Sequence, residues 1–308
     1  MRVVIALGGN AMTAADGRAR PEDQRAAIER AAEPVAAIVA AGHQVVLTHG
    51  NGPQVGNLLV KNELAAAVVP PVPLDWCGAQ TQGTIGTLIL NALARCGVSR
   101  VAALVSRTLV DVDDPGFRAP SKPIGRYLPR SEAALMMEHG QIWQDRGARG
   151  WRRVVASPEP RACLDSSAAS ALLDAGYVVT CAGGGGVPVV DDGAGGFRGV
   201  EAVIDKDLTA ALLAATLGAD ALIIATDVEA AMLDWGTPGA RALGEVDVVS
   251  LRGHAAAGAF AGGSMGPKVE AACRFAEAGR GFAAITSLEG IGEALARTSG
   301  TIVSRSKE

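Results

Sequence analysis

Met1-Arg-Val-Val-Ile-Ala-Leu-Gly-Gly-Asn-Ala11 opens the chain and indicates its fold class. Residues 3–7 predict a short buried strand, because a continuous apolar run rich in β-branched side chains is typical of a parallel strand covered on both faces. The strand stops at Gly8 and Gly9, whose backbone amides can approach a ligand with no Cβ in the way. Ligands of open α/β sheets bind beyond the carboxyl ends of strands, so this stretch predicts either an anion-binding loop or a plain turn into a helix.

Glycine-rich turns follow two further predicted strands. Residues 44–48 run into His49-Gly-Asn-Gly-Pro-Gln-Val-Gly-Asn57, and residues 177–181 run towards Gly183-Gly-Gly-Gly186. Exposed amides at such turns bind anions, so three turns of this kind in one chain favour a pocket for a polyphosphate or an acyl phosphate. For residues 183–186 the alternative is a crowded crossing of backbone segments, where only glycine fits.

Strands and helices alternate along most of the chain. Helices are predicted at residues 21–41, from residue 53, and at residues 75–95, 165–175, 206–217 and 262–279. Asp75 is the expected N-cap of the third of these helices. The turn at residues 191–196 predicts a hairpin whose second arm reaches Val203. The alternation indicates the α/β class, with a mostly parallel sheet between helical layers.

Residues 111–160 depart from this alternation. They contain six prolines, several arginines and a single short helical stretch near Glu132. This texture predicts an inserted subdomain or lid rather than another strand–helix unit. Lys122 stands out in Pro120-Ser-Lys-Pro-Ile-Gly125, because two prolines stiffen the loop around one cation. The basic cluster at residues 146–153 is expected to be a solvated loop.

The composition excludes several classes of protein. With 308 residues, 49% hydrophobic and 19% charged, the chain is globular rather than disordered or fibrous. A net charge of −4 with dispersed Lys and Arg gives no sign of nucleic-acid binding. The longest apolar region, residues 208–225, is interrupted by Gly218 and Asp220, so no membrane span is predicted. Five scattered cysteines without a C-x-x-C pair predict reduced thiols and a cytoplasmic location.

Two nucleotide-binding motifs are approached but not met. Residues 262–269 resemble the P-loop pattern, but Pro267 stands in place of the second glycine and Val269 in place of the hydroxyl residue. Residues 50–56 resemble a dinucleotide fingerprint, but the acidic residue expected at the end of a following strand is missing. The chain is therefore neither a P-loop enzyme nor a typical dinucleotide-binding protein.

Three lysines suit phosphoryl transfer, which needs cations around the phosphoryl oxygens and amides that hold donor and acceptor in line. Lys122, Lys206 and Lys268 each lie in a stiffened loop or at a helix start. A single lysine is usually a solvated surface residue. Lys206 differs because it stands between Asp205 and Asp207, where one acid can cap the helix and the other can orient the ammonium group.

Two smaller features leave alternatives open. His49 lies at a predicted strand end beside glycines, so it is a candidate for ligand contact, whereas the other three histidines are expected at surfaces or turns. The turn Trp235-Gly-Thr-Pro238 either shelters an adenine or is a simple apolar turn.

Taken in order, the motifs resemble those of the carbamate kinases in the amino-acid kinase family. The matching stretches are Ala6-Leu-Gly-Gly-Asn10, His49 to Asn57 as quoted above, Pro73-Leu-Asp75, Thr81-Gln-Gly83, Lys122-Pro-Ile-Gly125, Gly150-Trp-Arg-Arg153, residues 181–190, Gly199-Val-Glu-Ala-Val-Ile-Asp-Lys-Asp207 and Gly263-Ser-Met-Gly-Pro-Lys268. They run from end to end, so the resemblance covers essentially the whole chain.

The resemblance implies a three-layer αβα sandwich with a mostly parallel eight-stranded central sheet. It implies one domain over residues 1–308, with residues 111–160 as a small protruding subdomain over the site, and a homodimer. The implied reaction is reversible: carbamoyl phosphate and MgADP give MgATP and carbamate, which decomposes to ammonia and carbon dioxide. A cytoplasmic enzyme of arginine metabolism is expected, without nucleic-acid or membrane partners.

The resemblance also implies roles for individual residues. Many relatives carry a phosphate-binding lysine on the first strand, and Lys122 is expected to replace it because this chain has Ala6 there. Lys206 would hold the transferred phosphoryl group, Asp205 would orient the lysines, and Lys268 would reach the nucleotide phosphates. The implied substrate loops are Gly8, Gly9, Asn10, Gly50, Asn51 and Gly52, and the implied nucleotide side includes Lys206, Thr226, Asp227, Met265 and Lys268. Mg²⁺ is expected to be held through the nucleotide phosphates and water, with no metal ligand from the protein.

The chain departs from the family on the nucleotide side. Thr226-Asp-Val-Glu-Ala-Ala-Met232 replaces the common pattern T-D-x-D-x-V-Y, so an aromatic residue is lost at Met232 and Glu229 is gained. The departure is expected to change the fit of the nucleotide more than the class of reaction. Two alternatives stay open: an enzyme of the same fold that phosphorylates another small acid, and a non-catalytic sensor of carbamoyl phosphate or nucleotide.

Overall fold

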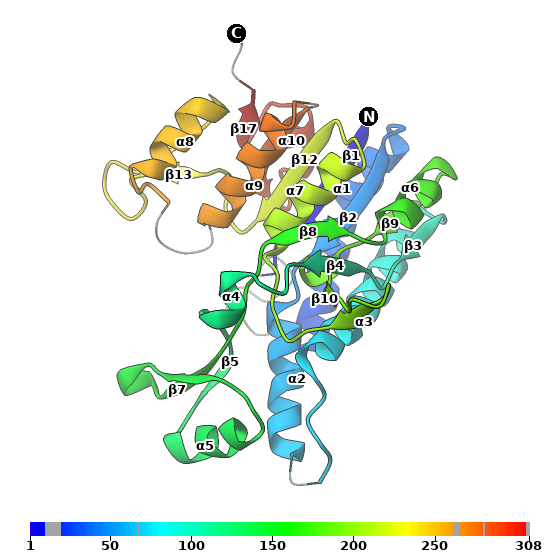
Figure 1. Cartoon of the computed structure of the whole chain (residues 1–308). Coiled ribbons are helices and arrows are strands. Elements are labelled where there is room, and N and C mark those ends of the chain that lie inside the picture. The colour runs from blue at the N-terminus through cyan, green and yellow to red at the C-terminus, as the bar shows by residue number, and fades with distance from the viewer. Residues whose placement is uncertain (10–19, 67, 261–264, 280, 306–308) are drawn as a thin grey trace.

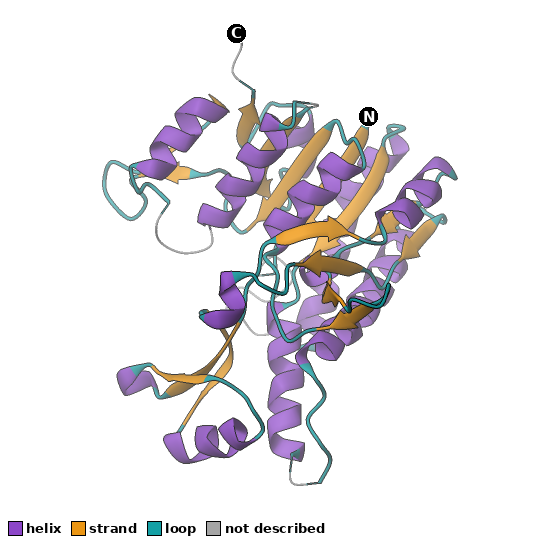
Figure 2. Cartoon of the chain, viewed as in Figure 1, coloured by secondary structure: helices purple, strands orange, loops and turns teal. Residues whose placement is uncertain are grey.

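A central eight-stranded sheet organises the protein, whose computed structural model describes residues 1–9, 20–66, 68–260, 265–279 and 281–305. The strand order is β15-β17-β16-β12-β1-β2-β9-β3, and neighbours are parallel except for β16 and β17 (Figures 1 and 2). The strands are β1 (Arg2–Leu7), β2 (Gln44–His49), β3 (Val101–Ala103), β9 (Val178–Thr180), β12 (Ala221–Thr226), β15 (Glu245–Asp247), β16 (Phe282–Ser287) and β17 (Thr301–Ser304). The predicted mostly parallel sheet is therefore confirmed.

Helices cover both faces of this sheet, as the alternation of strands and helices predicts. Along β1, Val4 and Ala6 pack on one face while Val3, Ile5 and Leu7 pack on the other, because successive side chains of a strand point to opposite sides. The first face is covered by α6 (Ser166–Asp174), α7 (Lys206–Thr216), α8 (Val248–Ala256) and α9 (Met265–Glu277). The second face is covered by α1 (Pro21–Ala40), α3 (Leu74–Arg95) and α10 (Ile291–Leu295). The result is a three-layer αβα sandwich.

A second sheet lies beside the carboxyl ends of the central strands. Its order is β11-β10-β4-β8, and its strands are β4 (Arg107–Val110), β8 (Pro160–Cys163), β10 (Val187–Asp191) and β11 (Phe197–Gly199). The predicted hairpin is present, but its second arm ends at Gly199 and not at Val203. The Val200 N–H still donates to the Pro188 carbonyl of β10, but Ala202 then forms a parallel bridge with Ala156, which lies outside the four strands of this sheet.

The third sheet stands away from the main body, next to α2 (Gly52–Ala65), and falls within residues 111–160 (Figure 1). Its order is β5-β7-β6, and its elements are β5 (Lys122–Leu128), α5 (Arg130–Glu138), β6 (Trp143–Asp145), the short 3-10 helix η2 (Gly147–Arg149) and β7 (Trp151–Val155). The expected solvated loop at residues 146–153 is wrong in its second half, because β7 begins there and Arg153 is only 5% exposed. The remaining described elements are α4 (Pro115–Arg118), η3 (Gly183–Gly185), β13 (Met232–Leu233) and β14 (Arg241–Ala242).

The start of α3 differs from the prediction. Pro73, not Asp75, is the N-cap, and Asp75 is buried within the first turn. The Leu74 N–H, one of the donors at the helix start without an intrahelical partner, donates to Glu201 Oε1 at 3.1 Å. The partner is 127 residues away in the sequence, so a local pattern could not reveal it.

No helix among the described residues is both long and apolar enough to cross a lipid bilayer.

Candidate active site

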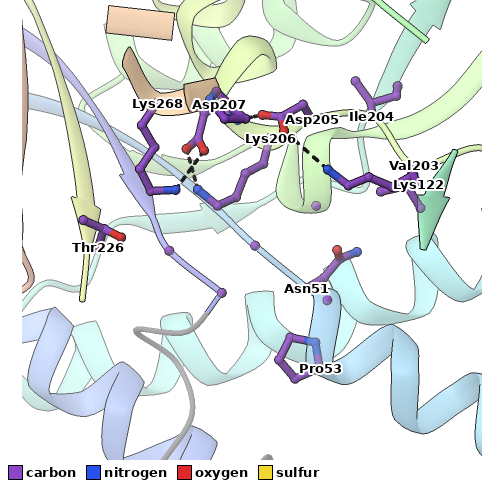
Figure 3. Close-up of a pocket in the computed structure, with 16 residues that line it drawn as sticks. Asn51, Pro53, Lys122, Val203, Ile204, Asp205, Lys206, Asp207, Thr226 and Lys268 are labelled. Atoms are coloured by element: carbon purple, nitrogen blue, oxygen red, sulfur yellow. Dashed lines mark hydrogen bonds and ion pairs between the residues drawn. The ribbon is translucent and has the colours of Figure 1, made fainter. Parts of the chain in front are cut away.

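A cavity of about 400 Å³ opens where β1, β2 and β12 end, as expected for a ligand site of an open α/β sheet (Figure 3). All three predicted glycine turns contribute to it. The lining residues are Gly8, Gly9, Gly50, Asn51, Gly52, Pro53, Lys122, Gly184, Val203, Ile204, Asp205, Lys206, Asp207, Thr226, Pro267 and Lys268. Asn10, the other predicted member of the first loop, lies outside the described residues.

The first two glycine turns touch back to back. A Cβ placed on Gly50 would lie 2.7 Å from the Gly9 nitrogen, closer than real Cβ atoms approach. A side chain at position 50 would therefore separate the two turns. Glycine there lets two strand ends present their backbones to the same space, which suits an anion held by amides.

The third glycine turn is mainly a crowded crossing, as the alternative interpretation predicted. A Cβ on Gly183 would lie 2.3 Å from His49 Nε2, and one on Gly186 would lie 2.0 Å from Thr108 Oγ1. Gly184, with φ of 68°, is the member of the turn that lines the cavity. The turn thus serves packing at three positions and the cavity wall at one.

His49 packs against this crossing and lines neither of the two cavities, so it does not lie where a ligand contact was expected. The side chain is fully buried, and its Nδ1–H donates to the Gly50 carbonyl at 2.9 Å. Burial lowers its pKa to about 4; the hydrogen bond to Gly50 opposes the change and the charge of Lys206 adds to it. His49 is consequently neutral at physiological pH and acts as a packing residue.

Two of the predicted lysines share one buried carboxylate. Lys206 Nζ lies 2.5 Å from Asp207 Oδ1, and Lys268 Nζ lies 3.0 Å from Asp207 Oδ2. Lys206 begins α7 and Lys268 lies in the first turns of α9, so two neighbouring helices aim their cations at the same point. The sequence placed Asp207 beside Lys206 but did not identify it as the link between these lysines.

Burial and charge act against each other in this cluster of Lys206, Asp207 and Lys268. Burial lowers the pKa of Lys206 and Lys268 adds to the effect, while Asp207 opposes it. For Asp207, burial works to raise the pKa, but the two lysines together outweigh it and hold the pKa below its usual value. The cluster therefore keeps an ionised carboxylate with two lysines, an arrangement that favours an incoming anion.

Asp205 has a different task from Asp207. It is the N-cap of α7, and its Oδ1 accepts from the N–H groups of Asp207 at 3.0 Å and Leu208 at 3.4 Å. Its Oδ2 lies 3.6 Å from Lys122 Nζ, which comes from β5 of the third sheet. The resemblance implied that Asp205 orients the lysines in general. In the structure it contacts Lys122, and Asp207 contacts the other two.

The three lysines reach the cavity from two sides (Figure 3). Lys268 and Lys206 lie together near Thr226, while Lys122 reaches in from the opposite side, above Asn51. Lys122 is the most exposed of the three, with 40% of its side chain accessible, against 16% for Lys206. A phosphoryl group between them would meet cations on both sides.

The predicted nucleotide residues are only partly brought together. Thr226 lines the cavity and donates its hydroxyl to Asp227 Oδ1 at 3.0 Å, but Asp227 itself is not in the lining. Met265 begins α9 and packs against the core instead. Trp235 is 70% exposed and lies outside the cavity lining.

A second cavity of about 420 Å³ adjoins the first and shares Asn51, Lys122 and Gly184 with it. Its apolar walls come from α2, α3, β5, β10 and the segment after β11, namely Val55, Leu74, Ile124, Pro188, Ala202 and Val203. Arg152 adds a second cation. The described residues hold no group of three or more His, Cys, Asp or Glu side chains that could bind a metal ion.

The sequence profile described as the amino acid kinase family matches residues 1–287. The chain is 44% identical to a carbamate kinase of Thermococcus kodakarensis, with 99% of each chain covered. It is 46% identical to a carbamate kinase of Rhizobium meliloti, covering 99% of this chain and 94% of the relative. A solved carbamate kinase of Giardia lamblia bound to AMP-PNP superposes with a TM-score of 0.93 at 40% identity, covering 99% of this chain and 98% of the other.

Proposed function

The chain belongs to the amino acid kinase family, and from this premise we propose that it transfers a phosphoryl group between carbamoyl phosphate and ADP. The products are ATP and carbamate, and the reaction is reversible. The observation that carries the proposal is the glycine-lined cavity with Lys122, Lys206 and Lys268 around it. Together with relatives that match over nearly the whole chain, it supports an ATP-dependent phosphotransferase.

The geometry suits catalysis by positioning and charge, without a covalent nucleophile. A transferring phosphoryl group carries negative charge on its equatorial oxygens, and fixed cations stabilise it in a site shielded from water. Lys206 would contact the group in transfer, and Lys122 would contact it from the carbamoyl phosphate side. The amides of residues 8–9 and 50–52 would hold carbamoyl phosphate in line with the nucleotide.

The nucleotide would approach from the side of Thr226 and Lys268. Lys268 is fixed by Asp207, so its ammonium group is held ready for the nucleotide phosphates. The carboxylates in the lining are already engaged, Asp205 by the start of α7 and by Lys122, and Asp207 by two lysines. These residues therefore fit Mg²⁺ that is held through the nucleotide phosphates, where it would neutralise phosphate charge.

A second candidate keeps the fold and changes the acceptor. The adjoining cavity of about 420 Å³ has apolar walls and exceeds the needs of carbamate, which has four non-hydrogen atoms. A larger small acid could use Lys122 and Arg152 for its anionic group. A non-catalytic sensor is less favoured, because binding alone does not require three lysines arranged around the place of transfer.

The deciding experiment measures ATP formation from MgADP and carbamoyl phosphate, with a blank for the spontaneous decay of carbamoyl phosphate. Enzyme-dependent ATP is the expected result. If ADP binds and no ATP forms, the assay is repeated in the reverse direction with ATP and a panel of small carboxylic and phosphonic acids. Turnover of one of these would favour the second candidate, and no turnover at all would favour the sensor.

The outer face of α3 supports a homodimer. Its exposed residues follow one helical stripe and carry no charge from residue 76 to residue 91: Trp76, Gln80, Gly83, Thr84, Thr87 and Asn91. The side chain of Trp76 is 62% exposed. Depletion of charged residues and an exposed aromatic side chain are features of interface centres. A second copy packed on this stripe would cover it symmetrically.

The five free cysteines are consistent with a cytoplasmic location.

The variant Thr87→Glu is expected to convert such a dimer into a monomer, because a two-fold interface would bring two buried carboxylates together. Sedimentation velocity would measure the molecular mass. Thr216→Glu on α7 is the matched control, since Thr87 and Thr216 both donate their hydroxyls to the carbonyl four residues earlier, at 2.9 and 2.8 Å. A dimer that persists in Thr87→Glu, or a monomeric wild type, would remove α3 as the interface.

A further inference from the structure

Three motif residues that the proposed reaction does not use meet outside the catalytic cavity. Arg153 lies on β7 of the third sheet, Glu201 follows β11, and Asp75 lies in the first turn of α3. Glu201 Oε2 accepts from Arg153 Nη2 at 3.0 Å, and its Oε1 accepts from the Leu74 N–H at 3.1 Å. A Cβ placed on Gly199 would lie 2.0 Å from Asp75 Oδ2, so the segment bearing Glu201 passes directly over the helix start.

The burial of Arg153 makes this contact unusual for an ion pair. Its side chain is 6% exposed, whereas a surface arginine keeps its charge in water. Glu201 is 48% exposed, so only the arginine side of the pair is buried; that guanidinium still depends on its partner, because removing Glu201 leaves a buried charge uncompensated. Glu201 is thus fixed by two groups from different parts of the fold, one from α3 and one from the third sheet.

Each member of the pair lies on a segment linked through the backbone to a residue of the cavity. Arg153 stands opposite Ile124 on β5, and the same strand pairing places Lys122 opposite Val155. Glu201 precedes Asp205 by four residues in a segment whose Val203 N–H donates to the Ala156 carbonyl at 3.0 Å. The ion pair therefore joins the strand pair that carries Lys122 to the segment that carries Asp205.

Lys122 is held less closely than the other two lysines of the cavity. It is the one cavity lysine that comes from the third sheet, and its contact with Asp205, at 3.6 Å, is longer than the contacts within the Asp207 cluster. The other fixing contacts of the sheet against α2 are apolar packing around Val155 and an ion pair between Arg126 and Glu63 at 2.8 Å. Val203 also packs against this apolar cluster, so the Arg153–Glu201 ion pair adds a charged contact to an apolar one between the third sheet and the segment of Asp205.

We propose that Arg153 and Glu201 are positioning residues that fix Lys122 against Asp205 in the geometry needed for phosphoryl transfer. The inference rests on the proposed function, since it concerns the lysine assigned there to carbamoyl phosphate. Misplacement of a catalytic group by about 1 Å can cost about a hundredfold in rate, so a backbone connection remote from the reacting atoms can govern turnover.

The test is a double-mutant cycle of Glu201→Gln with Lys122→Ala, measured as ATP formation. Glutamine keeps the shape of the side chain and an oxygen for the Leu74 N–H but removes the charge that binds Arg153. Glu201→Gln is expected to lower kcat by about tenfold to a hundredfold, with the KM for ADP changed by less than about threefold, because the nucleotide side is untouched. In the Lys122→Ala background the same substitution should lower kcat by less than about threefold, since no lysine remains to be positioned.

Controls separate positioning from loss of fold. Glu29→Gln removes a carboxylate paired with Arg95 between α1 and α3, remote from the cavity, and should leave kcat within about twofold of wild type. Melting curves show whether each variant is folded at the assay temperature. If Glu201→Gln is not folded there, Arg153→Lys takes its place in the cycle, because it keeps the charge and loses the forked geometry.

Two results would overturn the inference. One is a kcat within about threefold of wild type in the Glu201 variant, and the other is an equal loss in the presence and absence of Lys122. The second result would mean that the pair only stabilises the fold. Failure of the proposed function is distinct, because the wild-type protein would then form no ATP from carbamoyl phosphate and MgADP.

Discussion

Replacing Lys206 with methionine should lower turnover by about a hundredfold or more, the scale of losing one charge-stabilising group at a developing anion. Lys206 lines the cavity beside Lys268, and Lys122 reaches in from the opposite side (Figure 3). Methionine keeps the length and packing of the side chain but carries no charge. The measurement is kcat and KM for ATP formation under saturating MgADP and carbamoyl phosphate.

The Lys206 variant should remain folded. Burial already lowers the pKa of Lys206, so the folded state disfavours its charge, and Asp207 keeps Lys268 as a partner. Lys61→Met, which removes an exposed lysine from α2, serves as the control and should retain full activity. Turnover of the Lys206 variant within a few-fold of wild type would refute its assignment to the transferred phosphoryl group.

The sequence predicted the features that depend on local patterns. The apolar run that ends at Gly8 and Gly9 identified the first strand and its glycine turn, and the same pattern identified the turn at Gly50. Lys122 and Lys206 could be selected because each lies in a stiffened setting. Such features are encoded within about ten residues, so one sequence is enough to find them.

The features that the sequence missed depend on contacts between distant segments. Asp207 was recognised as a neighbour of Lys206, but its second partner, Lys268, is 61 residues away. Arg153 belongs to a basic cluster that was predicted to be a solvated loop. It is buried instead and pairs with Glu201, 48 residues later. Both stretches match motifs of the family, which indicated that they have a role. Their pairing depends on how the third sheet packs against the segment after β11, which a local sequence pattern does not show.

Asp207→Asn should be the most disruptive single change in the cavity. Asparagine preserves the shape of the side chain but leaves two lysines close together with no carboxylate between them. Removing one partner from a buried ion pair typically costs about 3–5 kcal/mol of folding free energy. A lower melting temperature is therefore expected. Asp174→Asn is the matched control, since its ion pair with Arg2 is exposed and should contribute less than about 1 kcal/mol.

The pH dependence of the Asp207→Asn variant gives a sharper test than its melting temperature. Asp207 raises the pKa of Lys206 against the effects of burial and Lys268, so the pKa of Lys206 should fall further when the carboxylate is lost. Residual activity, which needs the charged lysine, should then decline as pH rises through the lowered pKa. The free energy of unfolding should change in the opposite direction, because the unfolded chain holds a proton on Lys206 up to a higher pH than the folded chain does.

In the wild type, the carboxylate adds a second pH dependence of stability, in the same direction but in the acid range. The pKa of Asp207 is held below its unfolded value, so the stability that it provides is present above pH 4 and is lost as pH falls through the lowered pKa. The Asn variant should lack this acid-sensitive part. Urea unfolding and initial rates, each measured across a pH series, would show stability rising while activity falls. Unchanged profiles in both measurements would mean that Asp207 does not control the charge of Lys206, and the shared-carboxylate account of the cavity would have to be abandoned.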